Sequence, residues 1–174
     1  MIIMEIVNGL VLKKTDTENF FTTCIFILKR YIRQNDKVLE IGAGSGRYTK
    51  DIVKMCKELT VGDISTHQIE FNKSKMKELS LFEKIKDFYV LDMLDMGIFE
   101  DSSFDCIVCI GGVINYLLDK EKDGINEMLR VLKPGGILIV GAMSFIGASL
   151  YYLDGIKYEK DKFGIEATKW VFNT

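Results

Sequence analysis

The stretch that decides the fold is VLEIGAGSGRYT, residues 38–49. It begins as a short apolar strand, is interrupted by Gly42, Gly44 and Gly46, and leads into residues 46–57, whose pattern is typical of a helix. Glycine allows positive φ angles and lets a ligand approach the main chain closely. The stretch therefore predicts a strand, a ligand-binding turn and a helix, in that order.

The spacing of these glycines separates three kinds of binding loop. The phosphate-binding loop G-x-x-x-x-G-K-[ST] is absent, because no Gly-Lys-Ser/Thr follows. The dinucleotide loop G-x-G-x-x-G fails at its last position, which is Arg47. What remains is Glu-x-Gly-x-Gly-x-Gly, beginning at Glu40. An acid before the loop disfavours a pyrophosphate and suits a ligand with a positive group, such as an amino-acid ammonium.

Outward from this stretch, strands and helices alternate along the chain. The expected strands are 38–41, 59–64, 88–91, 104–110 and 137–142, and the expected helices are 18–33, 46–57, 66–80 and 120–132. Such alternation is typical of parallel β-α-β units with right-handed crossovers. We therefore expect an α/β fold of three layers around a doubly wound, mostly parallel sheet, with ligands beyond the carboxyl ends of its strands.

Length and composition are those of a single globular domain. The chain has 174 residues, of which 48% are hydrophobic and 28% charged, and this balance supports a core and excludes a disordered chain. The net charge is −2, so no global charge favours nucleic acid or an anionic membrane. A single histidine, His67, argues against a histidine-based zinc site, and we expect no metal.

Two apolar stretches have structural interpretations. Cys106 and Cys109 form a C-x-x-C whose functional alternative is a redox or half-zinc motif, but on a strand the two side chains point to opposite faces. Free buried cysteines suit a reducing compartment, so we expect a cytoplasmic protein. Residues 137–153 carry no charge, and we expect a buried strand and a short helix there in preference to a membrane span.

With its glycine loop, the sequence resembles the class I S-adenosylmethionine-dependent methyltransferases, and among them small-molecule enzymes. In that family the loop glycines cradle the cofactor, S-adenosylmethionine, and the acid before them lies near its amino-acid moiety. The resemblance implies a Rossmann-like fold. It also implies cofactor contacts from Glu40, Gly42, Ala43, Gly44 and Gly46.

Two further acids follow the ends of expected strands. An acid at the position of Asp63 can accept hydrogen bonds from two ribose hydroxyls, in S-adenosylmethionine as in NAD. The family has its ribose-binding acid in this place, and its acid after the third strand, here Asp92 followed by Met93, contacts the adenine amine and a main-chain amide. Ile64 and Ile110, at the ends of the second and fourth strands, complete the expected cofactor-binding set.

The sequence says less about the molecule that accepts the methyl group. The Asn/Asp-Pro-Pro-Tyr signature of enzymes that methylate amino groups of DNA bases or glutamine is absent, so we expect a small-molecule acceptor and no nucleic acid. Tyr116 either lines the methyl-transfer site or packs as an aromatic in a helix. His67 lies either at the cofactor edge or on a solvated first helical turn. These two are the candidate catalytic residues, and no base is assigned.

The chain is expected to form one methyltransferase domain. Residues 1–35 would be an N-terminal helical cap, 36–143 the cofactor-binding core, and 144–174 a shortened C-terminal part where the family adds two further strands. A missing edge strand would open the sheet to a second copy of the chain. The expected function is methyl transfer from S-adenosylmethionine to a small molecule. The alternatives are cofactor binding without efficient turnover and a nicotinamide-dependent oxidoreductase.

Overall fold

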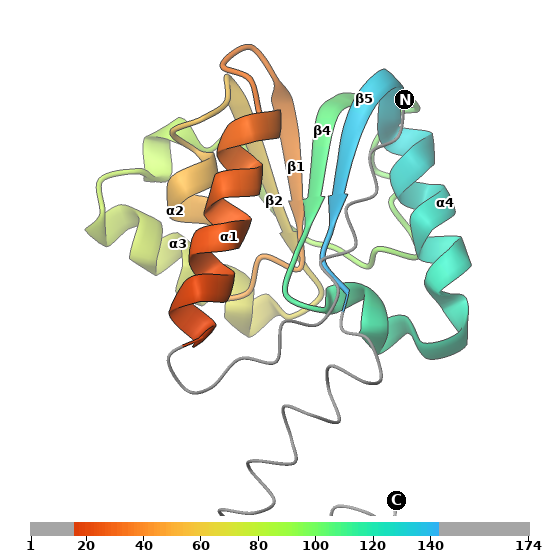
Figure 1. The fold of residues 1–174 in the computed structure, drawn as a ribbon, viewed down its shortest axis with the longest axis horizontal. Coiled ribbons are helices and arrows are strands. Elements are labelled where there is room, and N and C mark those ends of the chain that lie inside the picture. Colours follow the sequence, from red (N-terminus) through yellow and green to blue (C-terminus); the bar gives the residue numbers. More distant parts are fainter. Residues whose placement is uncertain (1–15, 143–174) are drawn as a thin grey trace, which may run out of the picture.

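The computed structural model describes residues 16–142 as a five-stranded sheet flanked by helices (Figure 1). The strands are β1 (Lys37–Ile41), β2 (Glu58–Asp63), β3 (Asp87–Val90), β4 (Phe104–Cys109) and β5 (Leu132–Val140). The helices are α1 (Asp16–Tyr31), α2 (Thr49–Ile52), α3 (Thr66–Glu78) and α4 (Glu121–Val131), with 3₁₀ segments η1 (Phe82–Lys84) and η2 (Val113–Lys120). The start of the expected cap and all of the expected C-terminal part lie outside the described residues.

All four strand pairings are parallel, in the order β3-β2-β1-β4-β5. The chain builds outward from β1 to β3 and then crosses to the other side of β1 to place β4. The order therefore reverses between β1 and β4. In sheets of this kind the carboxyl edge at such a switch point is where ligands bind.

The sheet is covered on both faces, which makes the expected three layers. On one face Leu28 of α1 and Ile69 of α3 pack with Val38 of β1 in a single apolar cluster. On the other face Met128 of α4 packs in a second cluster with Leu39. Figure 1 shows α1, α2 and α3 together on one side and α4 on the other. Strands buried on both faces explain the continuous apolar runs of the sequence.

The helix expected over residues 46–57 is much shorter in the structure. Only Thr49–Ile52 forms α2, and the chain on either side of it is a series of turns. After α2 the Met55 amide donates to the Ile52 carbonyl at 2.8 Å, an i→i−3 bond that tightens the helix end. The apolar spacing indicated the path of this segment but not its hydrogen-bond pattern.

Strand β5 begins earlier than the sequence indicates. Leu132 already pairs with Phe104, and regular pairing resumes where Ile137 lies opposite Cys106. The longer stretch of β5 between these two pairs forms a bulge, and it contains Pro134, which has no N–H for the strand ladder. The turn expected between α4 and the last strand is therefore part of an irregular strand start.

The cysteines have the positions that strand geometry predicts. All four lie in the described residues as free thiols, and Cys106 and Cys109 are fully buried in the clusters on opposite faces of the sheet. Within residues 16–142 no group of His, Cys, Asp and Glu side chains is arranged to hold a metal ion. None of the described helices has the length and apolarity needed to cross a membrane.

Candidate functional site

The candidate site lies at the carboxyl edge of the sheet, next to the switch point between β1 and β4. Backbone hydrogen bonds join the loops that leave neighbouring strands. The Ala43 amide donates to the Gly62 carbonyl at 3.1 Å, and the Leu91 amide donates to the Asp63 carbonyl at 2.9 Å. The segments after β1, β2 and β3, which carry most of the expected cofactor-binding residues, are therefore held side by side.

The glycine loop after β1 combines a tight contact with an open side. A Cβ on Gly42 would lie 2.4 Å from a methyl carbon of Val113, so the loop packs directly on the segment that follows β4. Gly44 has φ +53°, which side-chain-bearing residues rarely adopt, and among the described residues a Cβ there would meet nothing nearer than the Gln68 side-chain oxygen at 3.9 Å. The backbone at Gly44 is thus accessible to a ligand.

Asp63 links the glycine loop to the end of β2. Its Oδ2 accepts the Gly44 amide at 2.8 Å, and its Oδ1 accepts the Ser65 amide at 2.9 Å. The residue is only 8% exposed. Each carboxylate oxygen can accept about two hydrogen bonds, so within residues 16–142 Asp63 keeps one acceptor position on each oxygen for a ligand.

Glu40 is buried beneath the glycine loop. Its Oε2 accepts the Thr49 hydroxyl at 2.6 Å, and Asn72 of α3 donates both to that hydroxyl oxygen (3.0 Å) and to the Gly44 carbonyl (3.3 Å). Burial raises the pKa of Glu40 to about 8, against the opposing effect of the hydrogen bond from Thr49. In the domain without a ligand, the Glu40 carboxyl is therefore mostly protonated at neutral pH and supports the loop from below.

The segment after β3 forms a tight turn around Asp92. The Asp92 Oδ1 accepts the Leu94 amide at 2.9 Å, and the Asp92 carbonyl accepts the Asp95 amide at 3.1 Å. Asp92 itself is exposed, whereas the Met93 side chain is buried in the core on the α4 face. The turn thus presents a carboxylate outward while its neighbouring side chain anchors it.

The remaining expected residues differ in exposure. Ile64 is 69% exposed directly after Asp63, whereas the side chains of Ala43 and Ile110 are nearly buried. His67 is exposed on the first turn of α3. Tyr116 is 82% exposed on η2.

Comparison with known proteins agrees with this geometry. A sequence profile of the methyltransferase domain family matches residues 39–140, more than half of the chain. The chain belongs to the methyltransferase domain family. Over 112 residues it is 32% identical to the ubiquinone/menaquinone biosynthesis C-methyltransferase UbiE of Haemophilus ducreyi, a match that covers 63% of this chain and 42% of that protein. This methyltransferase domain thus spans less than half the length of the curated relatives it matches.

Solved structures extend the comparison to the fold. An S-adenosylmethionine-dependent methyltransferase from Methanosarcina mazei is 31% identical, with a TM-score of 0.56, and the match covers 64% of this chain and 55% of that one. The N-methyltransferase NodS from Bradyrhizobium japonicum, solved with S-adenosylhomocysteine, is 26% identical, with a TM-score of 0.60 and coverage of 72% and 61%. The expected family, the Rossmann-like fold and the family's cofactor, S-adenosylmethionine, are confirmed.

The methyltransferase domain offers groups that fit this cofactor. The open backbone at Gly44 is matched across the switch point by Gly111, where a Cβ would meet no atom within 4 Å among the described residues. Between the open loop and the end of β2, Asp63 has acceptor positions for neighbouring hydroxyls. The cradle and the donor and acceptor chemistry thus suit a ribose with an attached amino-acid chain.

Sequence reasoning missed two residues that shape the methyltransferase site. Asn72 supports the glycine loop, and Val113 packs against Gly42. A signal for Asn72 exists, because it interrupts the buried stripe of α3 between Ile69 and Met76 and is itself fully buried. No comparable local signal marks Val113, since its contact depends on the crossing of the chain from β3 to β4.

Proposed function

We propose that this domain binds S-adenosylmethionine along the carboxyl ends of β1, β2 and β3 and transfers the cofactor's methyl group to a small molecule. The observation that carries the proposal is the open backbone at Gly44 next to the nearly buried, hydrogen-bonded Asp63. Membership of the methyltransferase domain family supports it. The nicotinamide-dependent alternative is not favoured by any of the relatives described above.

Each part of the proposed cofactor site has a distinct chemical task. Asp63 accepts hydrogen bonds from the ribose hydroxyls, and Asp92 accepts one from the adenine amine. The exposed Ile64 offers an apolar surface to the adenine ring. The loop of Gly42, Ala43, Gly44 and Gly46 follows the amino-acid moiety, with Glu40 beneath it. Met93 and Ile110 fix the backbone on either side by burying their side chains.

Methyl transfer from this cofactor requires little proton transfer by the protein. S-adenosylmethionine supplies a methyl group that is already activated by a positively charged sulfur. The residues of the domain must align an acceptor atom with that methyl group and keep water out. A base is needed only when the acceptor is a hydroxyl, a phenol or an acidic carbon. Among the described residues, His67 and Tyr116 stay the proposed candidates for that task.

A small-molecule acceptor is supported from two directions. The sequence lacks the Asn/Asp-Pro-Pro-Tyr signature described above. The curated relatives named here are C-methyltransferases of ubiquinone/menaquinone biosynthesis, and NodS is an N-methyltransferase. Because these proteins methylate different kinds of atom, the proposal extends to a small acceptor and not to carbon or nitrogen in particular.

Titration calorimetry with S-adenosylhomocysteine, S-adenosylmethionine and NAD tests the cofactor. We expect saturable binding of the first two and none of NAD. Saturable NAD binding without S-adenosylmethionine binding would overturn the proposal. Binding of S-adenosylmethionine without methylated product, when a panel of small phenols, amines and quinols is supplied, would favour the alternative of a binding protein without turnover.

Asp63→Ala tests the ribose contact. We expect it to weaken S-adenosylhomocysteine binding by about 2–3 kcal/mol, the loss expected for hydrogen bonds to a charged acceptor. Asp36→Ala is the matched control, because Asp36 also accepts a backbone amide, that of Arg33 at 2.8 Å, but precedes β1 at the opposite edge of the sheet. An unchanged affinity in folded Asp63→Ala protein would remove Asp63 from the site.

A further inference from the structure

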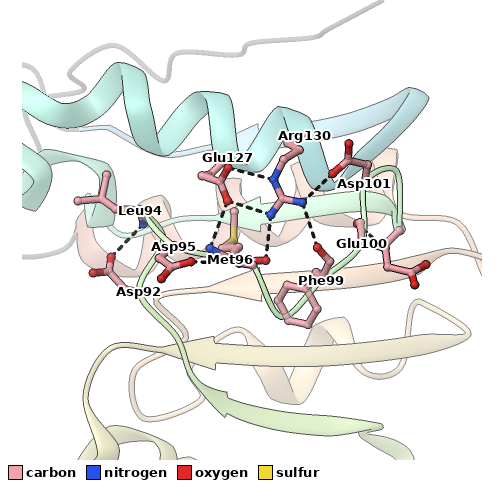
Figure 2. A network of polar contacts seen from close by, with 11 residues as sticks. Asp92, Leu94, Asp95, Met96, Phe99, Glu100, Asp101, Glu127 and Arg130 are labelled. Carbon is pink, nitrogen blue, oxygen red and sulfur yellow. Dashed lines mark hydrogen bonds and ion pairs between the residues drawn. The ribbon is translucent and has the colours of Figure 1, made fainter.

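All the hydrogen-bond donors of Arg130 in α4 are used, on residues 96–101 of the β3–β4 connection and on Glu127. An arginine has five N–H donors. In Arg130, Nη1 donates to the Phe99 carbonyl (3.0 Å) and Asp101 (2.8 Å), and Nη2 donates to the Met96 carbonyl (2.9 Å). Nη2 and Nε also donate to the two oxygens of Glu127, at 2.9 and 3.0 Å. Figure 2 shows this fork between α4 and the β3–β4 connection.

Glu127 and Arg130 together grip both backbone groups of Met96. Arg130 binds the Met96 carbonyl, and Glu127 Oε2 accepts the Met96 amide at 3.2 Å. The hydrogen bonds from Arg130 hold the pKa of Glu127 below its usual range, so Glu127 is an acceptor at neutral pH. Charged groups therefore hold the peptide units on both sides of Met96, and neither can rotate without breaking a charge-assisted bond.

Met96 ends the turn that carries Asp92. Asp92 and Asp95 face one another in an isolated antiparallel bridge, and Figure 2 shows that turn directly beside Met96. At the other end of the turn, the Leu91 amide is bound to the Asp63 carbonyl. The side chains of Met93 and Met96 are both buried in the α4-face core. The turn is therefore fixed to β2 at its start and to the Glu127–Arg130 pair at its end.

We propose that the Glu127–Arg130 pair of α4 is a positioning device for cofactor recognition, which holds the Asp92 carboxylate where it accepts the adenine amine. This inference rests on the proposed function. The pair does not touch the cofactor itself; it acts through Met96 and the Asp92–Asp95 turn. Its effect is specific to the purine end of the cofactor, because Asp63 and the glycine loop are held by separate hydrogen bonds.

A double-mutant cycle tests the coupling. S-adenosylhomocysteine affinity is measured by calorimetry for the wild-type chain, Arg130→Gln, Asp92→Ala and the double variant. We expect each single variant to lose roughly tenfold in affinity, as for a bond to a charged group. The double variant should also lose only about tenfold, no more than either single variant, because both changes remove the same contact. Multiplication of the two losses in the double variant, or no loss in Arg130→Gln, would overturn the inference.

Two controls separate positioning from general damage. Lys133→Gln removes a comparable ion pair, Lys133–Asp105 (2.6 Å), at the amino edge of the sheet, and we expect unchanged affinity. Glu127→Gln removes the charge but keeps an acceptor for the Met96 amide. It replaces Arg130→Gln as the test variant if urea titration shows that Arg130→Gln is unfolded. It should lose affinity in the same direction as Arg130→Gln, and an unchanged affinity in folded Glu127→Gln would count against the pair.

The purine amine provides a readout that a merely structural role would not change. The wild-type chain should bind S-adenosylhomocysteine more tightly than S-inosylhomocysteine, which has a carbonyl in place of the amine, and Arg130→Gln should lose most of that preference. A preference retained in full in folded Arg130→Gln would refute the positioning role. Failure of the wild-type chain to bind S-adenosylhomocysteine would instead refute the proposed function.

Discussion

At the scale of single residues, Glu40 makes a testable link between burial and pH. Burial raises its pKa from 4.5 to about 8, so between these pH values the folded domain holds a proton that the unfolded chain releases. The stability that the protonated Glu40 carboxyl contributes is therefore fully present below pH 4.5 and is lost as the pH rises toward 8. Over that range the free energy of unfolding falls by up to about 1.4 kcal/mol per pH unit.

Glu40→Gln should remove this dependence, because glutamine is neutral at every pH and similar in size. Urea unfolding of the ligand-free wild type and the variant at pH 5, 6, 7 and 8 measures the difference. The free energy of unfolding of the wild type should fall relative to the variant across this range. Parallel pH profiles for the two proteins would show that Glu40 titrates normally in the folded state.

Single residues also show where sequence reasoning reaches its limit. The pattern around residues 38–49 predicted that Glu40 lies on a strand and that the glycines form the turn after it, because strand and turn preferences are local. It did not predict that Glu40 is hydrogen-bonded to Thr49, or that Asn72 reaches from α3 to the Gly44 carbonyl. Those contacts depend on how α3 packs over the loop, which no spacing within one segment encodes.

At the scale of elements, Asp105 joins three strands at the amino edge of the sheet. It lies on β4, accepts the Lys37 amide at the start of β1 (2.9 Å), and accepts the Lys133 ammonium near the start of β5 (2.6 Å). Asp105→Ala should lower the free energy of unfolding by about 2 kcal/mol, since it removes hydrogen bonds to a charged acceptor, one of them from a part-buried backbone amide.

Asp105→Asn is the matched comparison, because its amide oxygen can still accept the Lys37 amide, and it should lose less than Asp105→Ala. Urea titration measures both. Cofactor affinity should stay at the wild-type value in both variants, since the glycine loop lies at the opposite edge. A large loss of S-adenosylhomocysteine affinity in Asp105→Asn would mean that the two edges of the sheet are coupled.

Elements were predictable in kind and order, and less so at their ends. The apolar spacing that predicts α4, with Ile125, Met128 and Leu129 on one face, is a property of one helix. The early start of β5 is different, because it depends on Leu132 finding Phe104 on another strand. The network of Arg130 is likewise invisible in sequence, since it joins α4 to carbonyls about thirty residues away.

At the scale of the whole molecule, the sheet separates two apolar layers, and most of its strands contribute side chains to both. Cys106 and Cys109 lie three positions apart on β4, one in each layer, and both are fully buried. Burial raises the pKa of both thiols to about 12. Since the thiolate is the reactive form, neither thiol should react with an alkylating reagent while both layers stay closed.

Alkylation with iodoacetamide, followed peptide by peptide with mass spectrometry, therefore tests whether the two layers open together. If the domain unfolds as one cooperative unit, Cys106 and Cys109 should be modified at the same slow rate, and the half-buried Cys56 should react faster. Addition of S-adenosylhomocysteine should slow Cys106 and Cys109 equally, because a ligand that binds only the folded state stabilises both layers. Different rates for the two would mean that one layer opens on its own.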